Sequence, residues 1–306
     1  MAHIKPDNDA VRRSQKMQRV QNLKKYLDTL APIFYQEYQC ISAHQQTVTL
    51  PKSIEDSPQK AIAQLEVYNT VKALEFTVNP ETFTVGINFS DDSGFGCHIE
   101  NVDIDSQQFC FGFMVFMNTL THRIMGAMKY HVPTGWCKVE IWKALKDLRN
   151  RVLYIFDADQ KKENQHHRPK GEIMKLISDF CAYLEAQELA YQKLYVDEYQ
   201  SSGLVHSEKS KKYYKVYDTI ETFNIFTNPE HFSAKMEFFG GPSEFMLGYV
   251  DIESQVFCYG VMTFVNTITY RIISALAIGD NTCEVQEQLS NTLNQIREFA
   301  KKMFYL

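Results

Sequence analysis

Glycine is scarce in this sequence, with 13 among 306 residues. That scarcity argues against a glycine-rich phosphate-binding loop and against an all-β fold with many tight turns. The motifs GxSxG, GxGxxG and the P-loop, which mark nucleophile elbows and nucleotide sites, do not occur. The usual sequence signatures of hydrolases and nucleotide-binding enzymes are therefore missing.

A strong excess of charge of either sign is also lacking, since the net charge is −5. Residues 1–156 carry 17 basic and 16 acidic side chains, and the remainder carries 15 and 21. One basic stretch stands out, at 12–19 with Lys24 and Lys25. We expect it to be a solvated helix face near a mobile terminus, and the alternative is a contact with nucleic acid or an anionic surface. Without a basic stripe over the whole chain, a nucleic-acid partner is not expected.

Paired cysteine motifs and long apolar runs are missing as well. The seven cysteines are scattered, without a CxxC pair, which is typical of reduced thiols in the cytosol. The first residues lack the apolar core of a secretory signal. The longest uncharged run, 106–122, is shorter than a membrane span requires. The sequence therefore predicts a cytoplasmic protein without a membrane span.

What the sequence does contain is an internal repeat. Residues 103–128 and 251–276 are identical at 15 of 26 positions without a gap. The match extends upstream, where Val67 and Tyr68 correspond to Val216 and Tyr217. Further upstream a fainter match aligns Tyr26 with Tyr183. This pattern predicts a duplicated unit of about 130 residues.

The repeat and the composition together divide the chain. We expect a flexible N-terminal tail over 1–16, a first unit over 17–156, a polar linker over 157–171 and a second unit over 172–306. The predicted fold class is α+β, with each unit ordered α-β-β-(β)-α-α and the two units related by a pseudo-twofold axis.

Local signals place the elements within each unit. The first helix carries apolar residues at helical spacing in both units, and Pro32 is expected to kink or restart it in the first unit. Strands are predicted at 83–89, 97–104, 232–239 and 245–252, joined by tight turns at 91–94 and 240–242. Residues 67–78 and their counterparts fit either a strand or a helix end, and the β-branched residues at 216–225 favour a strand.

Long apolar helices are predicted over 107–130 and 255–278, each capped by a serine, Ser106 and Ser254. Both carry repeated polar residues, which are candidates for ligand binding: Gln107, Asn118, Arg123, Gln255, Asn266 and Arg271. These groups either line a pocket for an anionic or planar ligand or fix helix to helix. In the second case each arginine is paired with a carboxylate such as Asp103 or Asp251.

A set of tyrosines in the second half is the other candidate: Tyr191, Tyr195, Tyr199, Tyr213, Tyr214 and Tyr217. Tyrosine offers a large contact area with a polar tip, so this set fits a protein-binding face. The alternative is that half of the rings pack into the fold. The histidines lack metal-ligand spacing, so neither a metal nor a cofactor is predicted.

These observations favour a non-enzymatic cytosolic interaction or adaptor protein, built from two duplicated units, whose partner is another protein. The alternative is a small-molecule binding or sensor protein with a site at the pseudo-twofold interface. An enzyme whose site no short motif records is a third hypothesis.

Overall fold

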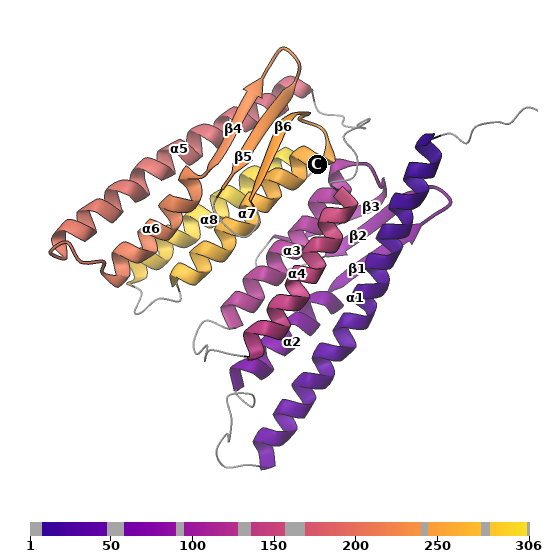
Figure 1. The fold of residues 1–306 in the computed structure, drawn as a ribbon, viewed down its shortest axis with the longest axis horizontal. Coiled ribbons are helices and arrows are strands. Elements are labelled where there is room, and N and C mark those ends of the chain that lie inside the picture. Colours follow the sequence, from indigo (N-terminus) through magenta and orange to yellow (C-terminus); the bar gives the residue numbers. More distant parts are fainter. Residues whose placement is uncertain are drawn as a thin grey trace, which may run out of the picture. The chain divides into compact units, whose positions relative to one another are not determined.

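The chain forms two compact units, residues 1–162 and 163–306 (Figure 1). The computed structural model describes residues 8–47, 58–89, 95–127, 136–156, 169–239, 244–276 and 282–304. Both expected turns, at 91–94 and 240–242, lie outside these residues, as does most of the linker. The end of the predicted linker is wrong, because a helix already begins at Lys170.

Unit 1 places two helices before a three-stranded sheet and two after it. The elements are α1 (Asn8–Thr47), α2 (Pro58–Lys72), β1 (Leu74–Asn79), β2 (Thr84–Phe89), β3 (Cys97–Asp103), α3 (Gln107–Ala127) and α4 (Trp136–Phe156).

Unit 2 has the same order of elements. They are α5 (Lys170–Ser201), α6 (Glu208–Glu221), β4 (Phe223–Asn228), β5 (Ser233–Phe238), β6 (Phe245–Asp251), α7 (Gln255–Leu276) and α8 (Cys283–Phe304). The α+β class is confirmed, with two separate antiparallel sheets ordered β1-β2-β3 and β4-β5-β6.

The segment before each sheet corrects the sequence interpretation. The helices α2 and α6 end with residues 67–72 and 216–221. The strands β1 and β4, which lead into the two predicted strands of each sheet, start only at Leu74 and Phe223. The β-branched residues that favoured a strand are spaced for a buried helix face, as with Val216, Thr219 and Ile220. Burial of such a face outweighs the small helix-propensity cost of β-branching.

The predicted flexible tail is also wrong for residues 8–16, which belong to α1. Three basic side chains from the first turns of α1 reach two carboxylates, Asp103 at the end of β3 and Asp105 just before α3. Lys16 Nζ lies 2.6 Å from Asp105 Oδ1, Arg12 Nη2 lies 2.9 Å from Asp105 Oδ2, and Arg13 pairs with Asp103. The basic run is therefore a docked helix face. Further along, α1 does not restart at its internal proline.

Unit 2 builds an equivalent contact at the start of α5. Lys170 Nζ lies 3.2 Å from both Asp251 and Glu253, the counterparts of Asp103 and Asp105. In each unit the basic group also lies over a phenylalanine ring: Arg13 over Phe83 and Lys170 over Phe232. We call this contact the clasp of each unit.

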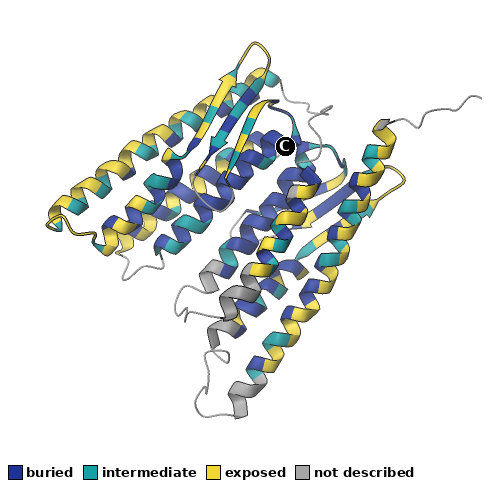
Figure 2. Ribbon diagram, in the orientation of Figure 1, coloured by how far each residue is buried: buried dark blue, intermediate teal, exposed yellow. Residues whose placement is uncertain are grey.

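The central helices α3 and α7 are buried over most of their length (Figure 2). Both predicted caps are confirmed: Ser106 Oγ accepts a hydrogen bond from the Phe109 amide, and Ser254 Oγ from the Phe257 amide, each at 3.2 Å. By composition α7 alone among the described helices is long and apolar enough to cross a membrane. However, 83% of its most apolar window is buried inside the structure, as in the core helix of a folded unit.

Each central helix approaches its sheet closely through a glycine. A Cβ at Gly112 would lie 2.6 Å from Ile99 Cδ1, and one at Gly260 would lie 2.5 Å from Met236 Cε. Because a normal contact between these carbons is far longer, only glycine fits without a shift of the neighbour.

The sheet faces that point away from the central helices differ between the two units. In unit 1 this face carries polar groups, and His98 contacts Asn88 and Glu100. In unit 2 the aligned strands expose Phe226, Met246 and Tyr249, the last two at 65% and 59%. Since unit 1 folds with polar residues here, the exposed apolar side chains of unit 2 are not a requirement of the fold.

Candidate functional site

The polar residues predicted on the central helices are mostly buried. Gln107, Asn118, Gln255 and Asn266 are each at most 7% exposed. Arg123, on α3, is half-buried and donates from Nη1 to Thr70 Oγ1 of α2 at 3.3 Å. Within unit 1 this joins one predicted site residue to a neighbouring helix.

Arg271 on α7, the counterpart of Arg123, is also half-buried, and it lies near Lys215 of α6. Burial, and then the positive charge of Arg271, lower the pKa of Lys215, whose Nζ donates to Ser274 Oγ at 3.1 Å. The carboxylates suggested as partners, Asp103 and Asp251, are instead held by the clasps. Asp103 and Asp251 therefore pair with the basic residues Arg13 and Lys170 near the start of α1 and α5.

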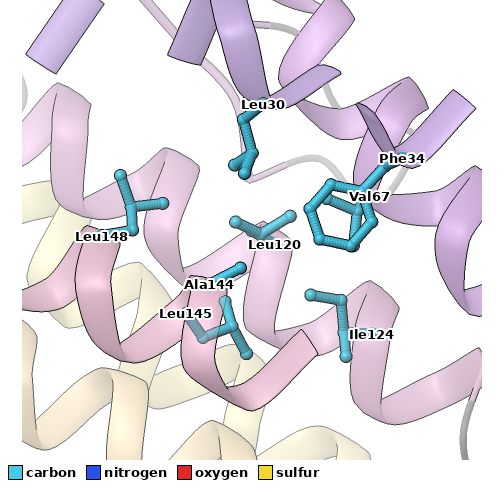
Figure 3. A pocket seen from close by; sticks show the side chains of 8 residues that line it. All are labelled: Leu30, Phe34, Val67, Leu120, Ile124, Ala144, Leu145 and Leu148. Carbon is cyan, nitrogen blue, oxygen red and sulfur yellow. The ribbon is translucent and has the colours of Figure 1, made fainter. Parts of the chain in front are cut away.

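A small cavity lies among the helices of unit 1 (Figure 3). Its volume is about 10 Å³, and it is lined by Leu30, Phe34, Val67, Leu120, Ile124, Ala144, Leu145 and Leu148. That is room for about one water molecule, and the lining offers no polar side chain to bind one. The cavity is a local packing gap, too small for a metabolite.

The tyrosine set divides into buried and exposed members. Tyr191 and Tyr213 belong to the core, at 0% and 3% exposed. Tyr195, Tyr199 and Tyr217 are half-buried, and Tyr214 is 44% exposed. Both sequence interpretations therefore hold for part of the set: some rings pack inside, and the others form a surface.

The exposed rings and one histidine form a continuous layer across α5, α6 and the loop between them. Tyr195 lies 5.2 Å from Tyr214 and 5.9 Å from Tyr199, and His206 lies 4.9 Å from Tyr199, as measured between ring centroids. Tyr217 extends the layer from Tyr214 at 6.3 Å. We call Tyr195, Tyr199, His206, Tyr214 and Tyr217 the tyrosine surface.

Helical spacing explains why these rings meet. Tyr195 and Tyr199 are four residues apart on α5, and they continue the stripe that buries Leu184 and Tyr191 deeper in unit 2. Tyr214 and Tyr217 are three residues apart on α6. The two pairs thus project from adjacent helices at the end of the unit where the loop connects them.

The loop between α5 and α6 adds apolar groups beside the rings. Leu204 and Val205 are 66% and 65% exposed, and Leu204 has a left-handed backbone with φ of 63°. Such a backbone is unfavourable for a residue with a side chain. It is held here by the hydrogen bond from the Leu204 amide to the Tyr199 carbonyl at 3.0 Å.

Carboxylates border the tyrosine surface on the side away from the loop. Tyr217 donates to Glu221, and Tyr214 is hydrogen-bonded to Asp218; in both cases the carboxylate raises the tyrosine pKa. Burial, and then the charges of Glu221 and Glu185, raise the pKa of Glu188. Three carboxylates, Glu188, Asp218 and Glu221, thus lie next to the exposed aromatic rings.

The aligned positions of unit 1 share the rings only in part. Tyr38 and Tyr68 correspond to Tyr195 and Tyr217, but Ser42 and Leu65 stand where unit 2 has Tyr199 and Tyr214. The three bordering carboxylates, Glu188, Asp218 and Glu221, are replaced as well. Their counterparts are Ala31, Asn69 and Lys72. The extended aromatic layer and its acidic border are therefore specific to unit 2.

Among the described residues, no group of three or more His, Cys, Asp and Glu side chains is placed to hold a metal ion. The cysteines described are free thiols, and burial raises the pKa of the Cys97 thiol to about 12, so it is protonated at neutral pH. The chain matches no known family model, no curated protein and no solved structure.

Proposed function

We propose that this chain is a non-enzymatic interaction protein of the cytosol, and that it binds a protein partner through the tyrosine surface of unit 2. The carrying observation is a continuous layer of four tyrosines and one histidine that is only partly covered within its unit. Tyrosine is enriched at protein interfaces because a rigid ring buries much area at low entropic cost.

The neighbouring loop supports the same interpretation. Leu204 and Val205 add exposed apolar area next to the rings, in a position where solvent would normally select polar residues. Contiguous exposed apolar surface of this kind is typical of docking sites. In unit 1 the helices α1 and α2 pack together although Ser42 and Leu65 stand at the positions of Tyr199 and Tyr214.

The experiment is chemical crosslinking and affinity purification from the native host with three forms of the chain. The variant Tyr199→Ser/Tyr214→Leu carries the residues of unit 1, and Tyr249→Ser removes an exposed ring outside the tyrosine surface. A partner that is retained by wild type and by Tyr249→Ser, but lost from the double variant, supports the proposal. A partner set that is identical for all three forms contradicts it.

We also propose that the two units are duplicated copies related by a pseudo-twofold axis. The identical element order, the matched clasps and the matched serine caps support a common origin. Spin labels test the symmetry, since Glu81 corresponds to Glu230 and Lys143 to Asn291. A twofold relation requires the distance from 81 to 291 to equal that from 230 to 143, and clearly unequal distances would exclude it.

A further inference from the structure

The acidic border of the tyrosine surface indicates what kind of partner fits it. Gln192 of α5 donates from Nε2 to the Tyr217 hydroxyl of α6 at 3.4 Å, and Glu188 and Glu221 each lie one helical turn beyond these two residues. Burial, and then the charge of Glu221, raise the pKa of Glu188. Repulsion between the two carboxylates is a cost that the free protein carries. A cation placed between the two helices would remove this cost and gain attraction from both carboxylates.

The rings favour a cation as well. A guanidinium stacks on a tyrosine face through its planar, weakly hydrated group, and it binds a carboxylate through two parallel hydrogen bonds. Tyr214 and Tyr217 each lie one helical turn before a carboxylate on the same side of α6, Asp218 and Glu221. One arginine side chain can therefore contact a ring and an acid of the same helix.

Unit 1 shows that this charge pattern is not needed for folding. The residues at the positions of Glu188, Asp218 and Glu221 carry a net charge of the opposite sign, because Lys72 replaces Glu221. The helix pair α1–α2 forms nonetheless. The negative charge thus belongs to the surface of unit 2 and not to the shared architecture.

The basic stretch of the chain itself is already engaged. Arg12, Arg13 and Lys16 are held by Asp103 and Asp105, and Arg19 lies over the ring of Tyr154 at 4.0 Å. These groups would have to leave their carboxylates in order to serve a second copy.

From this geometry we infer that the tyrosine surface binds an arginine-bearing segment of a different protein, with apolar side chains over Tyr195 and Tyr199 and guanidinium groups at Glu188, Asp218 and Glu221. The inference rests on the proposed function and names the partner class for the same surface. Apolar contact near the loop supplies area, and the acidic end selects the charge.

The test uses two defined probes with the full chain. One is a short amphipathic peptide whose polar face carries arginine, and the other is the same peptide with citrulline, which keeps the shape but lacks the charge. We expect the arginine peptide to bind at least about tenfold more tightly, with an advantage that shrinks as salt rises. Equal binding of the two peptides would overturn the inference.

A matched pair of variants locates the effect. Glu188→Ala/Asp218→Asn/Glu221→Lys gives unit 2 the charges of unit 1 and should abolish the preference for arginine. Glu172→Ala/Asp179→Asn/Glu287→Lys makes the same charge change at exposed carboxylates elsewhere and should retain it. Arginine preference that survives in the first variant would contradict the assignment.

Two further outcomes separate this inference from the proposed function. Should a native partner depend on Tyr199 and Tyr214 but remain bound to the Glu188/Asp218/Glu221 variant, docking stands and the basic partner is wrong. Analytical ultracentrifugation of the protein without any partner tests whether a second copy of the chain occupies the tyrosine surface. Self-association that the tyrosine variant removes would identify a second copy in place of an arginine-bearing partner.

Discussion

The hydroxyl oxygen of Tyr191 lies 2.8 Å from Thr292 Oγ1, in the interior of unit 2. Gln187 adds its Oε1 at 3.3 Å from the same threonine atom. In the aligned helices of unit 1 the corresponding residues are Leu30, Phe34 and Ala144, three of the residues that line the small cavity. One place in the common fold is thus polar and hydrogen-bonded in unit 2, but apolar and slightly underfilled in unit 1.

Removing the Tyr191 hydroxyl should destabilise unit 2 modestly. Tyr191→Phe breaks a buried hydrogen bond, but Thr292 keeps its bond to the Gln288 carbonyl at 3.1 Å. We therefore expect a loss of about 1 kcal/mol, measured by denaturant unfolding. A double-mutant cycle with Thr292→Val should show positive coupling, and strictly additive losses would contradict the pairing.

The reverse exchange is informative in unit 1. Phe34→Tyr alone would place a hydroxyl among apolar side chains, at a cost of about 1–3 kcal/mol. Phe34→Tyr/Ala144→Thr supplies the partner that unit 2 has, so the double variant should recover part of that loss. A double variant less stable than Phe34→Tyr would show that the two sites are not equivalent.

The two clasps should contribute unequally to stability. Lys16 is 5% exposed and Asp105 12%, whereas Lys170 is 37% exposed. Asp105→Asn leaves a buried lysine without its main counter-charge and should cost about 3 kcal/mol. Lys170→Ala should cost at most about 1 kcal/mol, the value for exposed pairs. Thermal unfolding of the two variants measures the difference.

Asp105 also predicts how unit 1 responds to acid. Burial opposes ionisation of this carboxyl, but the charge of Lys16 and hydrogen bonds from Lys16 and Arg12 outweigh burial, so its pKa lies below the usual value. The stabilisation is complete above the unfolded pKa of about 3.9 and is lost as the pH falls through the lower folded pKa. Wild type should therefore lose more stability than Asp105→Asn in this range.

Glu188 should act in the opposite direction. Its folded pKa is raised, so the ionised carboxylate disfavours the folded state at neutral pH, and this penalty disappears as the pH falls through that pKa. Glu188→Gln should therefore raise the melting temperature at pH 7 while it weakens binding of the arginine peptide. A lower melting temperature would indicate that the carboxylate makes stabilising contacts.

The central glycines offer a packing test. Gly112→Ala pushes on Ile99, a β-branched side chain, whereas Gly260→Ala pushes on the flexible end of Met236. We expect Gly112→Ala to be the more destabilising, by about 1–3 kcal/mol against a smaller loss for Gly260→Ala. Equal melting temperatures for the two variants would contradict this reading of the close approach.

Periodicity and capping in the sequence predicted the strongest local features. The buried α3 and α7, their serine caps and two strands of each sheet follow from short-range patterns. The ends of α2 and α6 could not be predicted from such patterns. Val216 and Ile220 suit a strand equally well, and only the neighbours that bury one face of α6 decide for a helix. The docking of residues 8–16 depends on Asp103 and Asp105, which no local pattern links to the N-terminal arginines.

Prediction of the candidate site is also limited because its residues lie far apart in the sequence. The tyrosines are visible in the sequence, but only the fold separates buried Tyr191 and Tyr213 from exposed Tyr214. The carboxylates of α5 and α6 become a common border only when the two helices pack side by side. For the central polar residues, the sequence could not foresee that Asp103 would bind Arg13 or that Arg123 would donate to Thr70.

The clasp of unit 1 has a consequence for the order of folding. Arg13 and Asp103 are 90 positions apart, so we expect their contact to form late in folding, because closing so long a loop is slow. We therefore expect this contact to be absent from the transition state. Weakening it should therefore leave the refolding rate unchanged and accelerate unfolding, so that the first turns of α1 govern how long the folded unit persists.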